Sequence, residues 1–221
     1  MNSNAVLKRT CMRDRIRDTL VSRILDGTYP AGTQLKELYL AREFDVSQAP
    51  IREALRELEG SGLVSSERFR GTRVKGADFA EMRESYELRM MLEMRSVSLA
   101  APYEPELLED LGEYLRGMDA AVKMDDSEAY IDNALRFHRR LVESSGNRTF
   151  LGVWDSLLWD IRGRIALRRL ADQGQSLKPL VNMHRTLLAR LRAQDVQGAT
   201  ERVKAILERV CSAFDEPAEI R

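Results

Sequence analysis

The sequence predicts a mainly α protein in two parts, a small helical unit that carries one β-hairpin and a larger all-α antiparallel helical bundle. The 221 residues are 32% charged and only 6% aromatic, a balance typical of helices with an apolar stripe and a charged outer face. Apolar residues recur at helical spacing along most of the chain. The exception is a pair of short β-prone pieces, 63–66 and 72–74, which predict the hairpin.

The first helix is expected from residue 12 to Asp26, because apolar residues fall four positions apart there and Gly27 and Pro30 then stop the pattern. A short apolar-periodic piece follows over 35–44. Ser47 is placed to cap the next helix with its hydroxyl on the free backbone N–H groups.

The third predicted helix has one apolar face and one polar face. Ile51, Ala54, Leu55 and Leu58 form its buried stripe. Its outward positions are Gln48, Ala49, Arg52 and Arg56. Three short helices followed by a hairpin with a basic tip are the order of a winged helix-turn-helix, in which the third helix enters the major groove of DNA.

The charge divides between the two parts, which we place at 1–76 and 77–221. The first part has 14 Lys and Arg against 10 Asp and Glu, a balance of +4, and the total of zero leaves −4 for the second. A basic first part is consistent with an anionic partner.

Other features bear on the class of protein and its compartment. Cys11 and Cys211 are the only cysteines, too few and too far apart for a disulfide framework or a zinc cluster. The N-terminal stretch lacks an apolar core of secretory length, and no segment approaches the roughly 18 apolar residues of a membrane span. These features predict a cytoplasmic protein without a membrane partner.

Six helices are predicted in the second part. Prolines, glycines and paired polar residues separate them, and each has an apolar stripe. Their expected ranges are 78–101, 106–122, 127–145, 149–170, 177–193 and 196–213. Such a bundle can enclose a cavity between its helices.

The first part resembles a known DNA-binding domain. The runs Gly27–Leu35, Leu40–Glu59, Gly62–Val64 and Arg70–Val74 are similar, in order and spacing, to the N-terminal domain of GntR-family transcriptional regulators. The resemblance implies DNA contacts at Ser47, Gln48, Ala49, Arg52, Arg56, Arg70 and Gly71.

The resemblance has one departure at the start of the third helix. Many relatives have an Arg-Thr pair where this chain has Gln48 and Ala49. Gln pairs with adenine where Arg prefers guanine, so the operator is expected to differ from the commonest half-site of the family. The alternative for Arg52 and Arg56 is a solvated helix face with ion pairs to neighbouring glutamates.

The second part resembles the FCD effector-binding domain of the FadR-type branch of the same family. The similarity lies in Tyr86–Glu93, Phe137–Arg139, Ser145–Asn147 and His184 with Asp195. Six helices after the linker resemble the VanR-like subgroup. Most such relatives hold a metal ion with one Asp and three His.

Only part of that metal-ligand set is present in this chain. His138 and His184 match two of the histidines, but Ala134 and Ala205 stand at the other two ligand positions. Two ligands of four are not expected to hold Zn²⁺ or Ni²⁺ tightly. We therefore expect no metal and no other cofactor, and a degenerate site.

The candidate effector-binding residues are Arg89, His138, His184 and Arg162. An inward Arg89 could grip a carboxylate bidentately, although it could equally pair with Glu93 along its own helix. The histidines could equally be core residues with satisfied hydrogen bonds. Trp154 and Trp159 are expected in the core or at a dimer contact.

These features predict a homodimeric transcriptional regulator, most simply a repressor, that binds a palindromic DNA operator under control of a small organic acid. One alternative is a DNA-binding protein without effector response. The other is a helical-bundle enzyme, which we do not expect because nucleophile motifs, phosphate-binding loops and a complete metal set are lacking.

Overall fold

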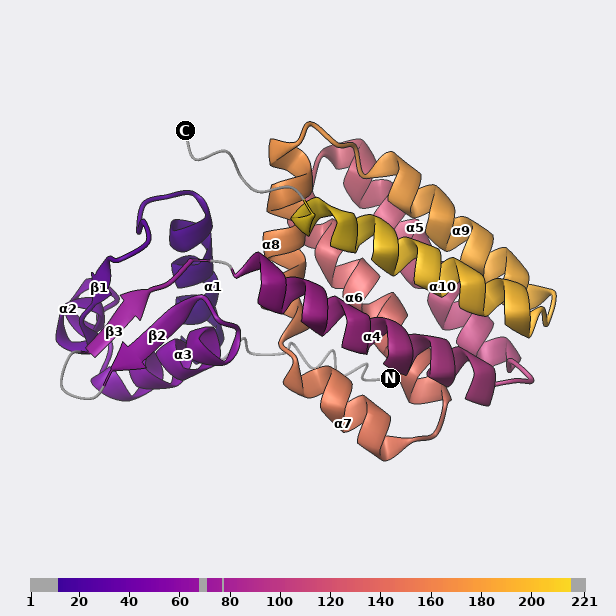
Figure 1. The fold of residues 1–221 in the computed structure, drawn as a ribbon, viewed down its shortest axis with the longest axis horizontal. Coiled ribbons are helices and arrows are strands. Elements are labelled where there is room, and N and C mark those ends of the chain that lie inside the picture. The colour runs from indigo at the N-terminus through magenta and orange to yellow at the C-terminus, as the bar shows by residue number, and fades with distance from the viewer. Residues whose placement is uncertain (1–11, 68–70, 77, 216–221) are drawn as a thin grey trace, which may run out of the picture. The chain divides into compact units, whose positions relative to one another are not determined.

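The computed structural model describes residues 12–67, 71–76 and 78–215. The chain divides into two compact units, residues 1–78 and 79–221 (Figure 1). Along the described ranges, none of the helices is long and apolar enough to cross a membrane.

In its described residues, the first unit combines three helices with a small sheet. Its elements, in order, are α1 (Met12–Leu25), β1 (Gln34–Leu35), α2 (Glu37–Glu43), α3 (Gln48–Gly60), β2 (Val64–Glu67) and β3 (Gly71–Val74). The sheet order is β1-β3-β2, with both pairs antiparallel. This is a winged helix-turn-helix with β2 and β3 as the wing.

The apolar stripes of α1 and α3 form the core of this unit, as their four-residue spacing predicts. Ile16 and Leu20 on α1 and Ile51 and Leu58 on α3 are at most 1% exposed. The expected helical piece 35–44 starts later than predicted, since Gln34–Leu35 pairs with β3 as a strand.

Ser47 stands at the N-cap of α3, but its side chain makes no capping hydrogen bond. The position of the cap was predicted correctly, but the predicted hydrogen bond from the Ser47 side chain is not formed. Because the hydroxyl makes no bond to its own helix, Ser47 can face a partner at the start of α3.

The second unit is all α within residues 79–215. Its helices are α4 (Phe79–Leu99), α5 (Pro105–Met124), α6 (Ser127–Ser144), α7 (Arg148–Ser156), α8 (Trp159–Asp172), α9 (Lys178–Arg192) and α10 (Val196–Cys211), followed by the 3-10 turn η1 (Ser212–Phe214). Figure 1 shows α4 and α10 side by side, and α4 also packs against α6. α5 packs against α6 and α9.

The prediction of a single helix over 149–170 is wrong, because the structure has two helices there, α7 and α8. Leu158 adopts a left-handed conformation with φ of 51°, which a non-glycine residue rarely adopts and a helix cannot contain. Residues 79–215 therefore form seven α-helices rather than six. The count of six, on which the VanR-like assignment rested, does not hold.

Candidate functional site

The start of α3 presents an open polar surface. Ser47, Gln48 and Ala49 are exposed, as are Arg52 and Arg56 one and two turns further along the helix. Burial of Ile51, Ala54, Leu55 and Leu58 on the opposite face fixes this orientation. The sequence-predicted contact residues of α3 thus lie together on one accessible face.

Arg52 is held by a carboxylate from the neighbouring helix. Its Nη2 lies 2.9 Å and its Nε 3.2 Å from Oε2 of Glu37 on α2. The bond to Glu37 raises the pKa of the Arg52 guanidinium, which is therefore fully charged. Arg52 therefore forms its ion pair with Glu37 of α2 rather than with a glutamate of its own helix, and its side chain stays 52% exposed.

Arg56 is exposed, and within the described parts of the chain it forms none of the intrahelical ion pairs that the sequence allows. On the wing, Gly71 pairs with Glu67 across the turn and has φ of 78°. That left-handed backbone suits glycine. Arg70, also predicted to contact DNA, lies outside the described residues.

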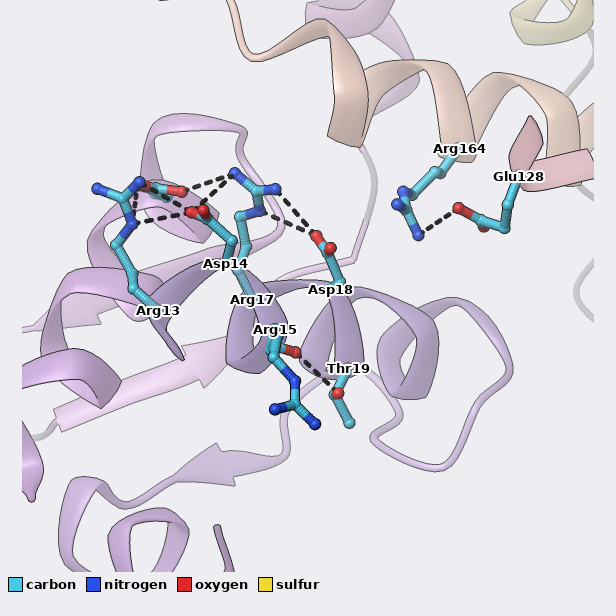
Figure 2. A network of polar contacts seen from close by, with 9 residues as sticks. Arg13, Asp14, Arg15, Arg17, Asp18, Thr19, Glu128 and Arg164 are labelled. Carbon is cyan, nitrogen blue, oxygen red and sulfur yellow. Dashed lines mark hydrogen bonds and ion pairs between the residues drawn. The ribbon is translucent and has the colours of Figure 1, made fainter. Parts of the chain in front are cut away.

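Two arginines of α1, Arg13 and Arg17, are engaged in ion pairs with carboxylates. Figure 2 shows Arg13 and Arg17 turned toward Asp14 and Asp18. Arg13 Nε and Arg17 Nη1 each also lie 3.1 Å from a carboxylate oxygen of Glu57 on α3. This network links α1 to α3. Arg13 and Arg17 therefore hold α3 in place and do not form a second basic surface.

Five helices of the second unit surround a mostly apolar cavity. The volume open to the centres of water-sized groups is ≈ 50 Å³. One water needs roughly 10–15 Å³ of such space, so the cavity has room for a few waters or a small metabolite. Its lining comprises Tyr86, Arg89, Tyr130, Ile131, Ala134, Leu135, His138, Gly163, Ala166, Leu167, Leu180, His184, Ile206, Leu207 and Val210.

Glu93 is the centre of a buried polar cluster beside this cavity. It is 0% exposed. Its Oε1 accepts hydrogen bonds from Arg89 Nε at 2.6 Å and from Trp154 Nε1 at 3.0 Å. Its Oε2 lies 2.5 Å from His138 Nδ1. Three donors from three helices therefore satisfy one carboxylate.

The two histidines of the chain contact each other in the lining of the cavity. Their Nε2 atoms are 3.0 Å apart, and His184 Nδ1 lies 2.7 Å from the carbonyl oxygen of Leu180. Both side chains are buried, at 3% and 2% exposure. The prediction that both point inward is confirmed by this geometry.

Burial and neighbouring charges shift the pKa values of the cluster in opposite directions. Burial raises the pKa of Glu93, but the combined effect of Arg89 and His138 outweighs it and lowers the pKa to about 2. Burial lowers the pKa of His138, and it lowers that of His184 to about 3. Burial also raises the pKa of Tyr86 to about 12. At neutral pH the cluster thus holds an ionised Glu93 and two neutral imidazoles.

Arg89 meets both of the expectations formed from the sequence. It pairs with Glu93 along α4, and it also lines the cavity. Its guanidinium lies over the ring of Trp159 at 4.7 Å. Among the described residues only its Nε has a hydrogen bond, so its terminal nitrogens can still serve a ligand.

Arg162 does not line the cavity, contrary to its place among the predicted effector residues. It is 4% exposed, and its Nη2 donates to Glu81 at 3.1 Å. Its Nε and Nη1 have no hydrogen-bond partner among the described residues. Trp154 and Trp159 are buried, as expected of core residues.

Sequence reasoning treated Glu93 only as a partner for Arg89 and missed its role as the shared acceptor. The missed signal was its position on the buried face of α4, one turn from Arg89. It also missed the hydroxyl-bearing Tyr86 and Tyr130 of the lining, and Glu37, which orients Arg52. Those positions look like ordinary core or surface residues in the sequence.

The residues of the cavity do not fit a metal ion. Ala134 lines the cavity and offers no donor, and the residues of α10 that line it are Ile206, Leu207 and Val210, not the predicted Ala205. Within the described chain there is no group of three or more His, Cys, Asp or Glu that could hold a metal. A protein Zn²⁺ site uses three or four protein ligands.

The buried histidines predict a specific pH dependence of stability. In the unfolded chain their pKa values are near 6.5, whereas burial keeps His184 neutral down to about pH 3 in the folded protein. The unfolded state therefore binds more protons below pH 6.5. The free energy of unfolding should fall by up to about 1.4 kcal/mol per pH unit on account of His184, between pH 6.5 and 3.

The measurement is urea unfolding of the wild type and His184→Asn at several pH values from 8 to 4.5. Asparagine does not titrate, so the variant should lose less stability than the wild type on acidification. If the free energy of unfolding fell with pH equally in the two proteins, His184 would not be the group that is neutral when folded and protonated when unfolded.

In comparisons with known proteins, each of the two units matches a known family. Residues 12–74 match the family described as bacterial regulatory proteins, gntR family, and residues 84–209 match the FCD domain. The gluconate operon transcriptional repressor of Bacillus licheniformis is 29% identical over 193 residues, covering 86% of this chain and 79% of that protein. The transcriptional repressor GlaR of Escherichia coli K12 is 28% identical over 192 residues, covering 82% and 86%.

The fold is also shared with a solved structure. Escherichia coli McbR/YncC superposes with a TM-score of 0.72 at 23% identity, covering 92% of this chain and 97% of that one. The matched families consist of DNA-binding transcriptional regulators and not of enzymes. The chain therefore belongs to the gntR family of bacterial regulatory proteins and carries an FCD domain.

Proposed function

We propose that the protein is a homodimeric repressor of transcription whose affinity for a palindromic operator is changed by a small organic acid bound in the FCD cavity. The observation that carries this proposal is the buried cluster of Arg89, Glu93, His138 and His184 beside a mostly apolar cavity. A few convergent polar groups in an apolar pocket are typical of a small-molecule site.

The proposed DNA contacts are the exposed residues at the start of α3 and on the wing: Ser47, Gln48, Ala49, Arg52, Arg56, Arg70 and Gly71. A single winged domain makes few base contacts, so two copies on two half-sites suit the symmetry of a palindrome. Repression is supported by the similarity to two repressors, that of the gluconate operon and GlaR.

The proposed effector contacts are Arg89, His138 and His184. The terminal nitrogens of Arg89 can bind a carboxylate end-on, and such charge-assisted pairs are strong in a buried site. The gluconate operon repressor suggests a sugar-derived acid as one candidate. An effector can change operator affinity only through a difference in its own affinity for the two DNA-binding states.

The test is a fluorescence-anisotropy titration of the full chain on DNA from upstream of its own gene, with and without each member of a panel of small hydroxy acids and plain carboxylic acids that includes gluconate. We expect at least one acid to change the operator affinity about tenfold or more. Acids that raise the melting temperature but leave operator affinity unchanged would contradict the coupling and favour a regulator without effector response.

A further inference from the structure

One face of α4 is exposed along the helix. The buried residues of α4 point into the second unit, whereas Glu84, Leu88, Met91 and Arg95 are all exposed. These four residues, which we call the α4 stripe, are spaced four, three and four positions apart, so they lie in one row on the helix surface. The same spacing forms the seam between two paired helices in a coiled coil. The α4 stripe therefore has the geometry of a pairing surface.

The centre of the α4 stripe is apolar. Leu88 is 38% exposed and Met91 is 69% exposed. A single exposed apolar side chain on a protein surface is ordinary. Two that adjoin on one helix seam leave water when a second helix covers them, which is favourable in free energy. The centre of the stripe is thus suited to the core of a protein–protein contact.

The ends of the α4 stripe carry opposite charges. Within the described parts of the chain, neither Glu84 nor Arg95 has an ion pair or a hydrogen bond from its side chain. The positions three and four residues away along α4 hold no group of opposite charge for either residue, so an intrahelical pair is not available to them. Both charges can therefore pair with another chain.

The order of residues along the α4 stripe makes it complementary to itself. It reads acid, apolar, apolar, base from Glu84 to Arg95. When two copies run antiparallel, each Glu84 meets the partner's Arg95, and each Leu88 meets the partner's Met91. A parallel pair would instead put like charges together at both ends, which is unfavourable. The charges thus select a second copy of this chain, in antiparallel orientation, as the occupant of the surface.

The α4 stripe is also centred on its helix. The midpoint between Leu88 and Met91 nearly coincides with the middle of the 21-residue α4. Two copies paired there overlap along the whole helix, which is roughly 30 Å long at 1.5 Å per residue. The two starts of α4 then lie at opposite ends, at a separation similar to the roughly 34 Å between half-sites one DNA turn apart. Because each first unit joins its own α4 at that end, the pairing suits a palindromic operator.

We propose that α4 pairs antiparallel with α4 of a second copy of the chain, with Glu84 of each copy bound to Arg95 of the other. This inference rests on the proposed function, which makes the protein a homodimer, and it adds the surface, the orientation and the register of the contact. Two-fold symmetry makes both contacts identical, as in an isologous dimer.

The test measures the oligomeric state of the full chain by sedimentation velocity at about 150 mM salt, where distant charges are screened. Arg95→Glu and Glu84→Arg each place like charges at both ends of the contact. Each variant alone should raise the dissociation constant of the dimer at least tenfold, because symmetry makes every change count twice. An equimolar mixture of the two restores both opposite-charge pairs in a heterodimer, so it should dimerise about as tightly as the wild type.

The matched controls are Glu113→Arg and Arg116→Glu on α5. Both residues are exposed and lie outside the α4 stripe, so these variants change the net charge by the same amounts and should dimerise as the wild type does. Recovery on mixing excludes misfolding as the cause of dissociation, since the mixture contains no wild-type chain. Failure of the mixture to dimerise, or equal dissociation of the controls, would overturn the inference.

A second pair of variants tests the apolar centre of the contact. Met91→Lys places a charge against the partner's Leu88 and should also raise the dissociation constant at least tenfold. Met124 at the end of α5 is 78% exposed, so Met124→Lys is the matched control and should leave the dimer unchanged. Equal effects of the two substitutions would overturn the inference.

The outcomes separate this inference from the proposed function. If the wild type is a dimer and Arg95→Glu, Glu84→Arg and Met91→Lys leave it intact, the α4 contact falls, whereas the homodimer of the proposed function stands on another surface. If the wild type stays a monomer both in solution and on operator DNA, the α4 contact and the homodimer fall together.

Discussion

Replacing Glu93 with glutamine is expected to lower the free energy of unfolding by about 3–5 kcal/mol, the usual cost of removing one partner of a buried ion pair. Glutamine has nearly the same size, so the change removes charge without opening a cavity. It leaves the guanidinium of Arg89, 4% exposed, without its carboxylate. The loss is a large part of the roughly 5–15 kcal/mol that holds a typical domain together.

The measurement is urea unfolding at pH 7, with Glu87→Gln as the matched control on the same helix. Glu87 is exposed, and a surface change of this kind normally stays within about 0.5 kcal/mol. If Glu93→Gln cost no more than Glu87→Gln, the buried cluster would not depend on the charge of Glu93.

Arg52→Ala is expected to weaken operator binding about 10- to 100-fold, as loss of a side chain that reads base edges costs about 1–3 kcal/mol. Arg52 lies on the exposed face of α3, and Glu37 holds its guanidinium in one orientation through two nitrogens. Binding is measured by fluorescence anisotropy at about 150 mM salt, because phosphate contacts make affinity depend on salt.

The control for charge alone is Arg15→Ala, which removes an exposed arginine from α1. Scrambled DNA is titrated in parallel. Arg52→Ala should lose the preference for operator over scrambled DNA, whereas Arg15→Ala should weaken both only slightly. Equal losses for the two variants on both DNAs would mean that Arg52 contributes charge and no specificity.

The elements that the sequence predicted well are those whose core face follows a regular period. α1 and α3 bury every fourth or third residue, so their extent and their outward faces follow from the spacing of apolar residues alone. The break between α7 and α8 could not be predicted, because Leu157 and Leu158 continue the apolar pattern. No glycine or proline stands at 156–160 to mark the left-handed turn at Leu158 in the sequence.

The polar cluster was only partly predictable for a related reason. Arg89 and Glu93 are four residues apart on one helix, so their contact could be expected from spacing alone. Trp154 and His138 come from other helices, 61 and 45 residues away from Glu93 in the chain. Contacts of that separation depend on how helices pack, so the shared acceptor and the facing Nε2 atoms became visible only in three dimensions.

The ion pairs of the first unit have a consequence for how the protein searches DNA. Arg13 and Arg17 are neutralised by Asp14, Asp18 and Glu57, as Arg52 is by Glu37. Fewer unpaired cations displace fewer counterions from a duplex, and counterion release is what drives attachment to random genomic DNA. We therefore expect weak attachment to bulk DNA, which would leave more of the protein free to find its site and give high occupancy there at modest operator affinity.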